Sequence, residues 1–192
     1  MIKVIDNALT KDQLSDIKEE VFTWLEYYRS QDMDNGIEGN TFGYPMIRPN
    51  KYAKYMDDII KKEYPSKKYM FTHSFTRVYF NNSGLKIHLD RKHLDLTASV
   101  NITSNLDEDW PLYFSNISID WERYMSKDEE ALDHDLFESE FDIYLKDCTP
   151  YYTKPGQAIL GEARLYPHWR YPLQCRKDQY YVQTFYHWME IK

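Results

Sequence analysis

The chain has 192 residues, which is enough for one domain with a substantial hydrophobic core. Its net charge of -7 argues against a protein that binds nucleic acid by neutralising phosphates, and no apolar stretch approaches the length of a membrane span. Cys148 and Cys175 are too few for a disulfide framework or a zinc cluster, and the N-terminus lacks the pattern of a signal peptide. We therefore expect a single domain over residues 1–192 in a cytoplasmic protein.

The first third of the chain, residues 1–67, is predicted to form a short strand and two helices. The strand covers residues 2–5. A capping box at residues 10–13 begins the first helix, and an apolar stripe at helical spacing carries it to about residue 31. The second helix is predicted over residues 51–63.

Residues 32–50, between the two helices, contain three glycines and two prolines. A segment of that composition builds little core of its own, so we expect a loop. Phe42 and Tyr44 supply aromatic anchors within it. The loop is expected to border the functional cleft, to move more than the strands and to order when a substrate binds. The alternative is a bridge between the helices on the back of the sheet.

From residue 68 onward the pattern is mostly β. Alternating apolar and polar residues over 94–103 predict a strand with two different faces. Further strands are predicted at residues 69–80, 110–114, 141–145, 158–160 and 180–191. Residues 120–147 form an acidic insertion with eleven Asp or Glu residues against three Lys or Arg residues, which we interpret as a solvated excursion rather than a docking site. Two helices followed by many short strands predict a mostly β, α+β domain, with helices bracing one face of an antiparallel barrel or sandwich.

His88 and Asp90 are candidate metal ligands. If they lie on a strand, the two-residue period places both side chains on the same face. The same spacing occurs again at His93 and Asp95, so the pair alone does not decide between the two positions. The context favours His88 and Asp90, because they follow an aromatic strand and the turn at residues 81–84 and precede the next core strand.

His168 is the candidate third ligand. It follows a glycine turn at residues 154–157 and an apolar strand, and it begins the sequence His168-Trp169-Arg170. Two imidazoles and one carboxylate on one side of a metal leave the opposite coordination positions open, which suits non-haem Fe(II) in oxygen chemistry.

This order of motifs resembles the Fe(II)/2-oxoglutarate dioxygenase superfamily, particularly small prolyl-hydroxylase-like proteins of bacteria and phages that share the His-Trp-Arg sequence. The resemblance covers nearly the whole chain. It implies a double-stranded β-helix (jelly roll) in residues 68–192 with N-terminal supporting helices. It also implies that His88, Asp90 and His168 hold Fe(II), with 2-oxoglutarate and O2 as co-substrates. The implied reaction is hydroxylation of an amino-acid side chain, peptidyl or free, with release of succinate and carbon dioxide.

The distal carboxylate of 2-oxoglutarate requires a cation. Many members of this superfamily place it on the last strand, and the corresponding stretch here reads Lys177-Asp178-Gln179. Arg170 is the first candidate because it belongs to the His-Trp-Arg sequence and because its planar guanidinium suits a carboxylate. Arg176 and Lys177 follow. By resemblance to prolyl hydroxylases, Tyr79 is a candidate hydroxyl donor to the co-substrate.

The expected partner is therefore a peptide, a protein or a small amino-acid substrate. Two other functions remain open at this point. A nucleobase oxidative demethylase would use the same metal chemistry, although the acidic composition and the lack of a basic stripe weigh against it. A non-catalytic jelly-roll binding protein would use the aromatic cleft alone. Iron-dependent formation of succinate separates these functions.

Overall fold

The computed structural model describes residues 2–30, 37–38, 41–44, 52–120 and 139–191. Within them lie the helices α1 (Lys11–Ser30), α2 (Ala53–Glu63) and α5 (Phe141–Lys146). The strands are β1 (Lys3–Ile5), β2 (Ile37–Glu38), β3 (Thr41–Tyr44), β4 (Tyr69–Tyr79), β5 (Leu85–His88), β6 (Leu96–Ser104), β7 (Leu112–Ser115), β8 (Cys148–Tyr151), β9 (Ala158–Gly161), β10 (His168–Arg170) and β11 (Tyr181–Glu190). No helix in this part of the chain is both long and apolar enough to cross a membrane.

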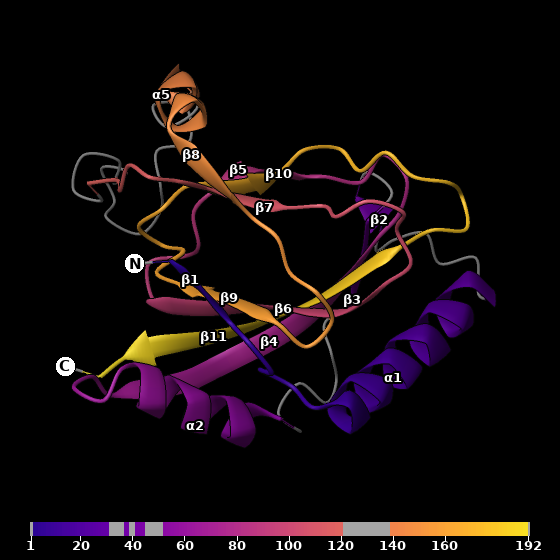
Figure 1. The fold of residues 1–192 in the computed structure, drawn as a ribbon, viewed down its shortest axis with the longest axis horizontal. Coiled ribbons are helices and arrows are strands. Elements are labelled where there is room, and N and C mark those ends of the chain that lie inside the picture. Colours follow the sequence, from indigo (N-terminus) through magenta and orange to yellow (C-terminus); the bar gives the residue numbers. More distant parts are fainter. Residues whose placement is uncertain (1, 31–36, 39–40, 45–51, 121–138, 192) are drawn as a thin grey trace.

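The described strands form two antiparallel sheets that face each other (Figure 1). The larger sheet has the order β1-β9-β6-β11-β4-β3-β2, and the smaller one has the order β5-β10-β7-β8. From β4 to β11 the chain passes repeatedly between them: β4, β6, β9 and β11 lie in the larger sheet, and β5, β7, β8 and β10 lie in the smaller one. This arrangement is the predicted jelly roll, and it confirms the fold class expected from the sequence.

Strand β6 has an apolar face in the hydrophobic core and a polar face on the opposite side of the larger sheet. Its apolar residues at even positions from 96 to 102 belong to the main hydrophobic cluster, and its polar residues at odd positions alternate with them on the other face. Every residue from Leu96 to Ile102 is nevertheless buried. The polar face of this strand is therefore turned into the space between the two sheets rather than toward solvent.

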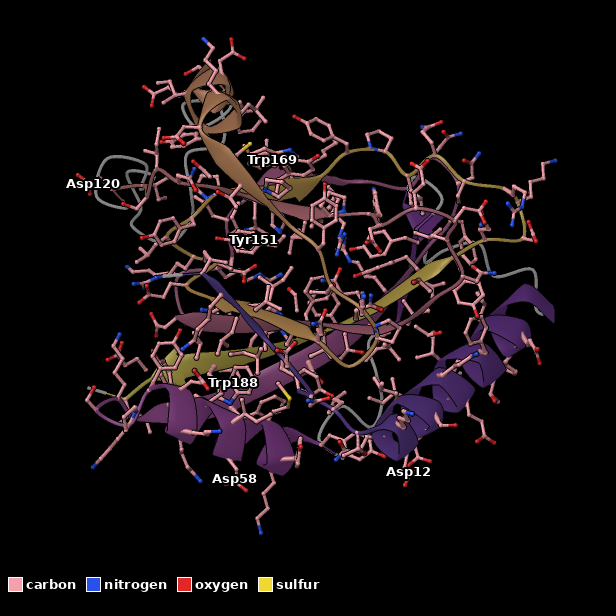
Figure 2. The ribbon with its side chains drawn as sticks, in the orientation of Figure 1. Asp12, Asp58, Asp120, Tyr151, Trp169 and Trp188 are labelled. Carbon is pink, nitrogen blue, oxygen red and sulfur yellow. The ribbon has the colours of Figure 1, made fainter. Side chains whose placement is uncertain are left out.

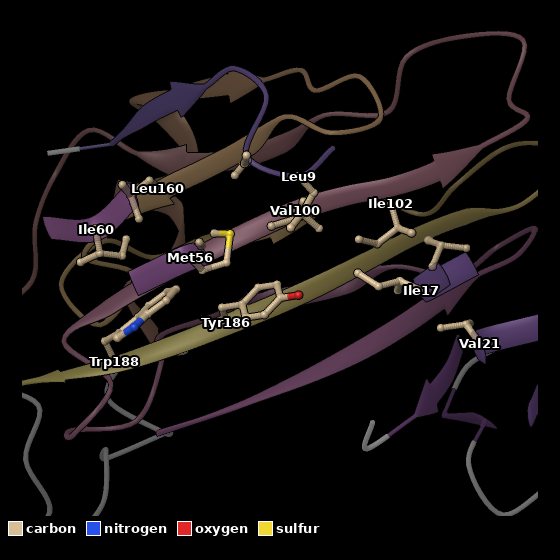
Figure 3. Close-up of a cluster of buried hydrophobic side chains, with 14 of the residues drawn as sticks. Leu9, Ile17, Val21, Met56, Ile60, Val100, Ile102, Leu160, Tyr186 and Trp188 are labelled. Carbon is tan, nitrogen blue, oxygen red and sulfur yellow. The ribbon is translucent and has the colours of Figure 1, made fainter. Parts of the chain in front are cut away.

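Helices α1 and α2 cover the apolar face of the larger sheet (Figure 1). Figure 3 shows Ile17 of α1, Met56 of α2, and Tyr186 and Trp188 of β11 in one buried cluster. Each fully buried large apolar side chain contributes about 1.5–3 kcal/mol relative to an exposed one. Trp188 lies on the helix side of the sheet in Figure 2, and its indole N–H donates to Asp57 Oδ1 at 2.6 Å, which ties α2 to β11.

The predicted capping box at the start of α1 is confirmed. The backbone N–H of Gln13 donates to Thr10 Oγ1 at 3.3 Å, and the backbone N–H of Thr10 donates to Gln13 Oε1 at 2.8 Å. These reciprocal bonds satisfy two backbone donors and mark the residue at which the helix begins.

The strand predicted at residues 141–145 is wrong, because these residues form helix α5. Phe141 and Tyr144 belong to one apolar cluster with Ile119, whereas Ile143 is 50% exposed, and this spacing is that of a helix rather than of a strand. A short apolar run is compatible with either period, so the sequence alone does not separate them. Residues 121–138 of the acidic insertion lie outside the described residues.

The loop expected at residues 32–50 is partly wrong as well, because β2 and β3 lie within it. Strand β3 pairs with β4, opposite residues 76–79, and so extends the larger sheet at that edge. Residues 32–36, 39–40 and 45–50 lie outside the described residues, and so do the side chains of Phe42 and Tyr44. The expected closure over a substrate therefore stays a prediction.

Candidate metal centre

Three potential ligands converge between the two sheets. Strands β5 and β10 are neighbours, and their register places His88 opposite His168, with ring centroids 4.1 Å apart. Asp90 lies just past β5, and its Oδ1 is 3.8 Å from His168 Nε2. One ligand atom from each residue lies within 4.8 Å of the others, and within the described ranges no second group of this kind occurs.

The two imidazoles are oriented in the same way. His88 Nδ1 lies 2.8 Å from the carbonyl oxygen of Lys86, and His168 Nδ1 lies 3.2 Å from that of Tyr166. A carbonyl oxygen only accepts, so each Nδ1 carries the proton and each Nε2 keeps a free lone pair. Burial lowers the pKa of His88, and burial together with the adjacent His88 lowers the pKa of His168 to about 3. Both rings are therefore neutral, as a metal ligand must be.

The carboxylate of Asp90 is held in place by Thr97 and the neighbouring rings. Burial alone would raise the pKa of Asp90, but His168, His187 and His88, together with the hydrogen bond from Thr97, hold that pKa below its ordinary value. Thr97 Oγ1 donates to Asp90 Oδ2 at 2.5 Å, and the backbone N–H of Asp90 donates to the carbonyl oxygen of Ala163 at 3.2 Å. The carboxylate is thus ionised, and its other oxygen, Oδ1, is directed toward His168.

The second His-x-Asp pair lies elsewhere. Asp95 forms an ion pair with Arg164 at 3.1 Å and accepts a hydrogen bond from the backbone N–H of Glu190 at 2.8 Å. His93 is exposed. The structure therefore brings His88 and Asp90, not His93 and Asp95, to His168.

Arg170 reaches across from β10 to the beginning of β11. Its side chain is 2% exposed. The guanidinium donates to the carbonyl oxygen of Trp110 at 2.5 Å, to the hydroxyl of Tyr181 at 3.2 Å and to Gln183 Oε1 at 3.0 Å. It also lies over the rings of Trp110 and Tyr181, at 4.5 and 4.6 Å from their centroids. Every hydrogen-bond acceptor that the described residues give Arg170 is neutral.

Around this buried cation, three polar groups have no hydrogen-bond partner among the described residues. They are Arg170 Nε, the hydroxyl of Tyr79 and Gln183 Nε2. Burial raises the pKa of Tyr79, so its hydroxyl keeps its proton. Each of the three groups can donate a hydrogen bond, and unpaired buried donors are costly. A buried cation beside unpaired donors fits a negatively charged ligand such as a carboxylate.

The structure does not bring Arg176 and Lys177 to this position. Arg176 is largely exposed and forms an ion pair with Asp107 and a second one with Asp178 at 3.5 Å. Lys177 is exposed in the same connection between β10 and β11. Tyr79, by contrast, is fully buried in one cluster with Tyr181.

Several polar groups of the site were not found from the sequence. Thr97 contacts Asp90, and His187 of β11 lies 3.7 Å from the same carboxylate. Gln183 and Tyr181 contact Arg170 from the same strand. The sequence does contain a pattern that indicates them. Tyr181, Gln183 and His187 occupy alternate positions of β11, on the face opposite the apolar one that packs on the helices.

Comparison with known proteins gives similarity at the level of structure. No protein-family model matches the chain, and no curated protein sequence matches it significantly. HygX from Streptomyces hygroscopicus, solved with nickel and 2-oxoglutarate, is 14% identical, with 98% of this chain and 82% of that chain covered and a TM-score of 0.60. The non-haem α-ketoglutarate-dependent carbocyclase SnoK from nogalamycin biosynthesis is 12% identical over 98% and 79%, with a TM-score of 0.66.

A third similar structure is the viral collagen prolyl hydroxylase of Paramecium bursaria chlorella virus 1, in complex with 2-oxoglutarate. It is 13% identical, the match covers 100% of this chain and 96% of that chain, and the TM-score is 0.58. All three similarities extend over essentially the whole of this chain. The chain therefore has the jelly-roll fold that these three structures share.

Proposed function

We propose that this protein is an Fe(II)- and 2-oxoglutarate-dependent dioxygenase that hydroxylates an amino-acid side chain, peptidyl or free. The convergence of His88, Asp90 and His168 carries the proposal. Two neutral imidazoles and one carboxylate form the facial ligand set that suits Fe(II) and leaves positions free for co-substrate and oxygen. The similar structures support it, since HygX has been solved with 2-oxoglutarate and with nickel or iron, and the viral protein is a prolyl hydroxylase.

The ligand set fits the metal through His88 Nε2, His168 Nε2 and Asp90 Oδ1. When bound, iron would activate O2 together with 2-oxoglutarate: one oxygen atom would go into succinate as 2-oxoglutarate loses carbon dioxide, and the other would be inserted into a C–H bond of the substrate. Lys86 and Tyr166 fix the ring tautomers through their carbonyl oxygens, and Thr97 fixes the carboxylate. The protein's own part at this centre is to present three ligands in one orientation, shielded from water.

The proposed anchor for the distal carboxylate of 2-oxoglutarate is Arg170. Its unpaired Nε and the hydroxyl of Tyr79, which also lies beside Arg77, offer donors to an anion, and no carboxylate among the described residues competes for them. Arg170 and His168 belong to the same three-residue strand, with both side chains directed between the sheets. One strand would therefore position the metal and the co-substrate together.

The test is an assay of the full-length protein for succinate formation from 2-oxoglutarate, with and without Fe(II). Candidate peptides and free amino acids are then screened for gain of one oxygen atom by mass spectrometry. We expect iron-dependent succinate formation that a true substrate stimulates. Failure of every condition to give iron-dependent succinate would contradict the proposal and favour a binding protein. Stimulation by methylated oligonucleotides alone would favour the demethylase.

Replacement of Thr97 by Val should weaken metal binding by about 10–100-fold, the usual effect of removing a group that orients a ligand. Val has nearly the same shape as Thr but cannot donate to Asp90 Oδ2. The measurement is titration with Co(II), followed by its absorption. The matched control is Ser99→Ala, on the same face of β6. Equal Co(II) affinities for Thr97→Val and the unmodified protein would show that the bond does not orient Asp90.

A further inference from the structure

A row of stacked rings lies beside the candidate metal centre. His187 and Phe185 of β11 face His73 and Phe75 of β4, with the His73 and His187 centroids 4.7 Å apart and those of Phe75 and Phe185 4.8 Å apart. Phe75 also stacks on His187 at 5.6 Å. His73 is exposed, whereas His187 is 2% exposed and lies against Asp90. The row, here called the aromatic wall, leads from the surface to the metal centre.

The hydrogen bonds of Thr97 fix the tautomer of His187. The hydroxyl of Thr97 has a single proton, and it donates that proton to Asp90 Oδ2, because an ionised carboxylate only accepts. Its oxygen must then accept from His187 Nδ1, which lies 3.0 Å away. His187 Nδ1 therefore carries the ring proton, and Nε2 keeps a lone pair.

The Nε2 atom of His187 is buried and has no hydrogen-bond partner among the described residues. Nδ1, on the opposite side of the ring, is the atom that Asp90 and Thr97 engage. Burial of an acceptor without a donor is unfavourable, so the atom fits a site whose partner arrives with a ligand.

We propose that His187 determines substrate specificity: its Nε2 accepts a hydrogen bond from an N–H or O–H group of the substrate, next to the carbon that is oxidised. The substrate group is then a neutral, compact donor that packs on Phe75 and Phe185. The inference rests on the proposed function and narrows it. A prolyl residue within a peptide has no N–H and would leave Nε2 unpaired. A site built around a buried hydrogen bond strongly disfavours analogues that lack the group.

The exposed end of the aromatic wall agrees with a neutral rather than a cationic group. His73, at this end, has the guanidinium of Arg91 and the carboxylate of Asp90 near enough to affect it electrostatically. Arg91 is exposed, whereas Asp90 lies deeper, beside His168 and His187. A cationic side chain would meet the like charge of Arg91 as it approached Asp90 from this direction.

The first test is the tautomer itself. Long-range proton–nitrogen NMR spectra of the full-length, metal-free protein labelled at its histidines distinguish Nδ1–H from Nε2–H, and the His187→Phe variant identifies the signals of His187. We expect the Nδ1–H form. Observation of the Nε2–H form in the unmodified protein would overturn the proposal, because that nitrogen could not then accept.

The second test uses pyrrole and furan as probes, since these planar five-membered rings have similar size but only pyrrole has an N–H. The protein is titrated with each by NMR, once metal-free and once with Zn(II) and 2-oxoglutarate. We expect pyrrole to bind about tenfold more tightly than furan, as one buried hydrogen bond allows, and the ratio to fall to about one in His187→Phe. The matched control is His73→Phe, which keeps the ring stacking and should keep the ratio.

Equal affinity for the two probes in the unmodified protein, absence of pyrrole binding, or an unchanged ratio in His187→Phe would each overturn the proposal. None of these measurements depends on turnover. A protein that discriminates between the probes but forms no iron-dependent succinate would contradict the proposed dioxygenase and leave only the hydrogen bond from a ligand to His187 Nε2 standing. A protein that forms iron-dependent succinate without discriminating between the probes would support the proposed dioxygenase and contradict the role of His187.

Discussion

Replacement of His168 by Ala is expected to abolish 2-oxoglutarate consumption, with a loss of about a hundredfold or more. Removal of a group that only orients a ligand already costs about 10–100-fold, and removal of the ligand itself costs more. His168 is also the residue that faces both His88 and Asp90, so its loss leaves the remaining pair without a third ligand. The measurements are succinate formation under saturating Fe(II) and the affinity for Co(II).

The matched control for this change is His93→Ala. His93 belongs to the competing His-x-Asp pair, but it is exposed and lies outside the ligand group. The His93→Ala variant should keep both metal affinity and turnover. Circular dichroism should show that His93→Ala and His168→Ala both retain their β structure. The reverse result, with turnover lost in His93→Ala and kept in His168→Ala, would show that the ligand set proposed here is wrong.

Replacement of Arg170 by Ala is expected to weaken 2-oxoglutarate binding by about a hundredfold. Truncation of one partner of a buried, hydrogen-bonded charge pair costs about 2–5 kcal/mol, and about 1.4 kcal/mol corresponds to a factor of ten. Arg170 lies between Trp110, Tyr181 and Gln183, so the same change also removes hydrogen bonds within the protein. Binding of 2-oxoglutarate and binding of Co(II) are therefore measured separately, and only the first should change strongly.

Arg170→Lys tests whether shape matters beyond charge. Lysine supplies a point charge in place of a planar fork, so we expect only partial recovery of 2-oxoglutarate affinity. Arg176→Ala is the matched control, because Arg176 is exposed and paired with Asp107 and Asp178. A normal requirement for 2-oxoglutarate in Arg170→Ala, together with a raised one in Arg176→Ala, would transfer the role to Arg176.

The elements with a long, regular period could be predicted from the sequence. The capping box of α1 and the alternation in β6 depend on neighbouring residues only, and both were correct. The helix at 141–146 and strand β8 were not predicted. Both elements are short. Pro150 in β8 also disfavours the prediction of a strand, because a proline is tolerated in a sheet mainly at its edge. Strand β8 lies at such an edge.

Some residues of the candidate site could also be predicted from local patterns, and others could not. The spacing of His88 and Asp90 is local, and the structure brings both to His168. The roles of Thr97, His187 and Gln183 depend on which strands become neighbours, which no local pattern contains. A polar face usually signals exposure to solvent, but in β6 and β11 that face is buried between the sheets. The sequence therefore shows which residues share the polar face, but only the position of the second sheet decides that this face is buried.

Strand β11 follows all the other described strands along the sequence, yet it lies in the middle of the larger sheet, between β6 and β4. A ribosome releases β4 and β6 well before β11, and until then each of these strands has an unpaired edge of backbone donors and acceptors facing the gap. Such edges pair readily with other chains, and sheets joined by distant segments form slowly. The nascent chain is consequently exposed to aggregation until residues 181–190 emerge, and translation stopped before residue 181 would release a sheet split into two parts.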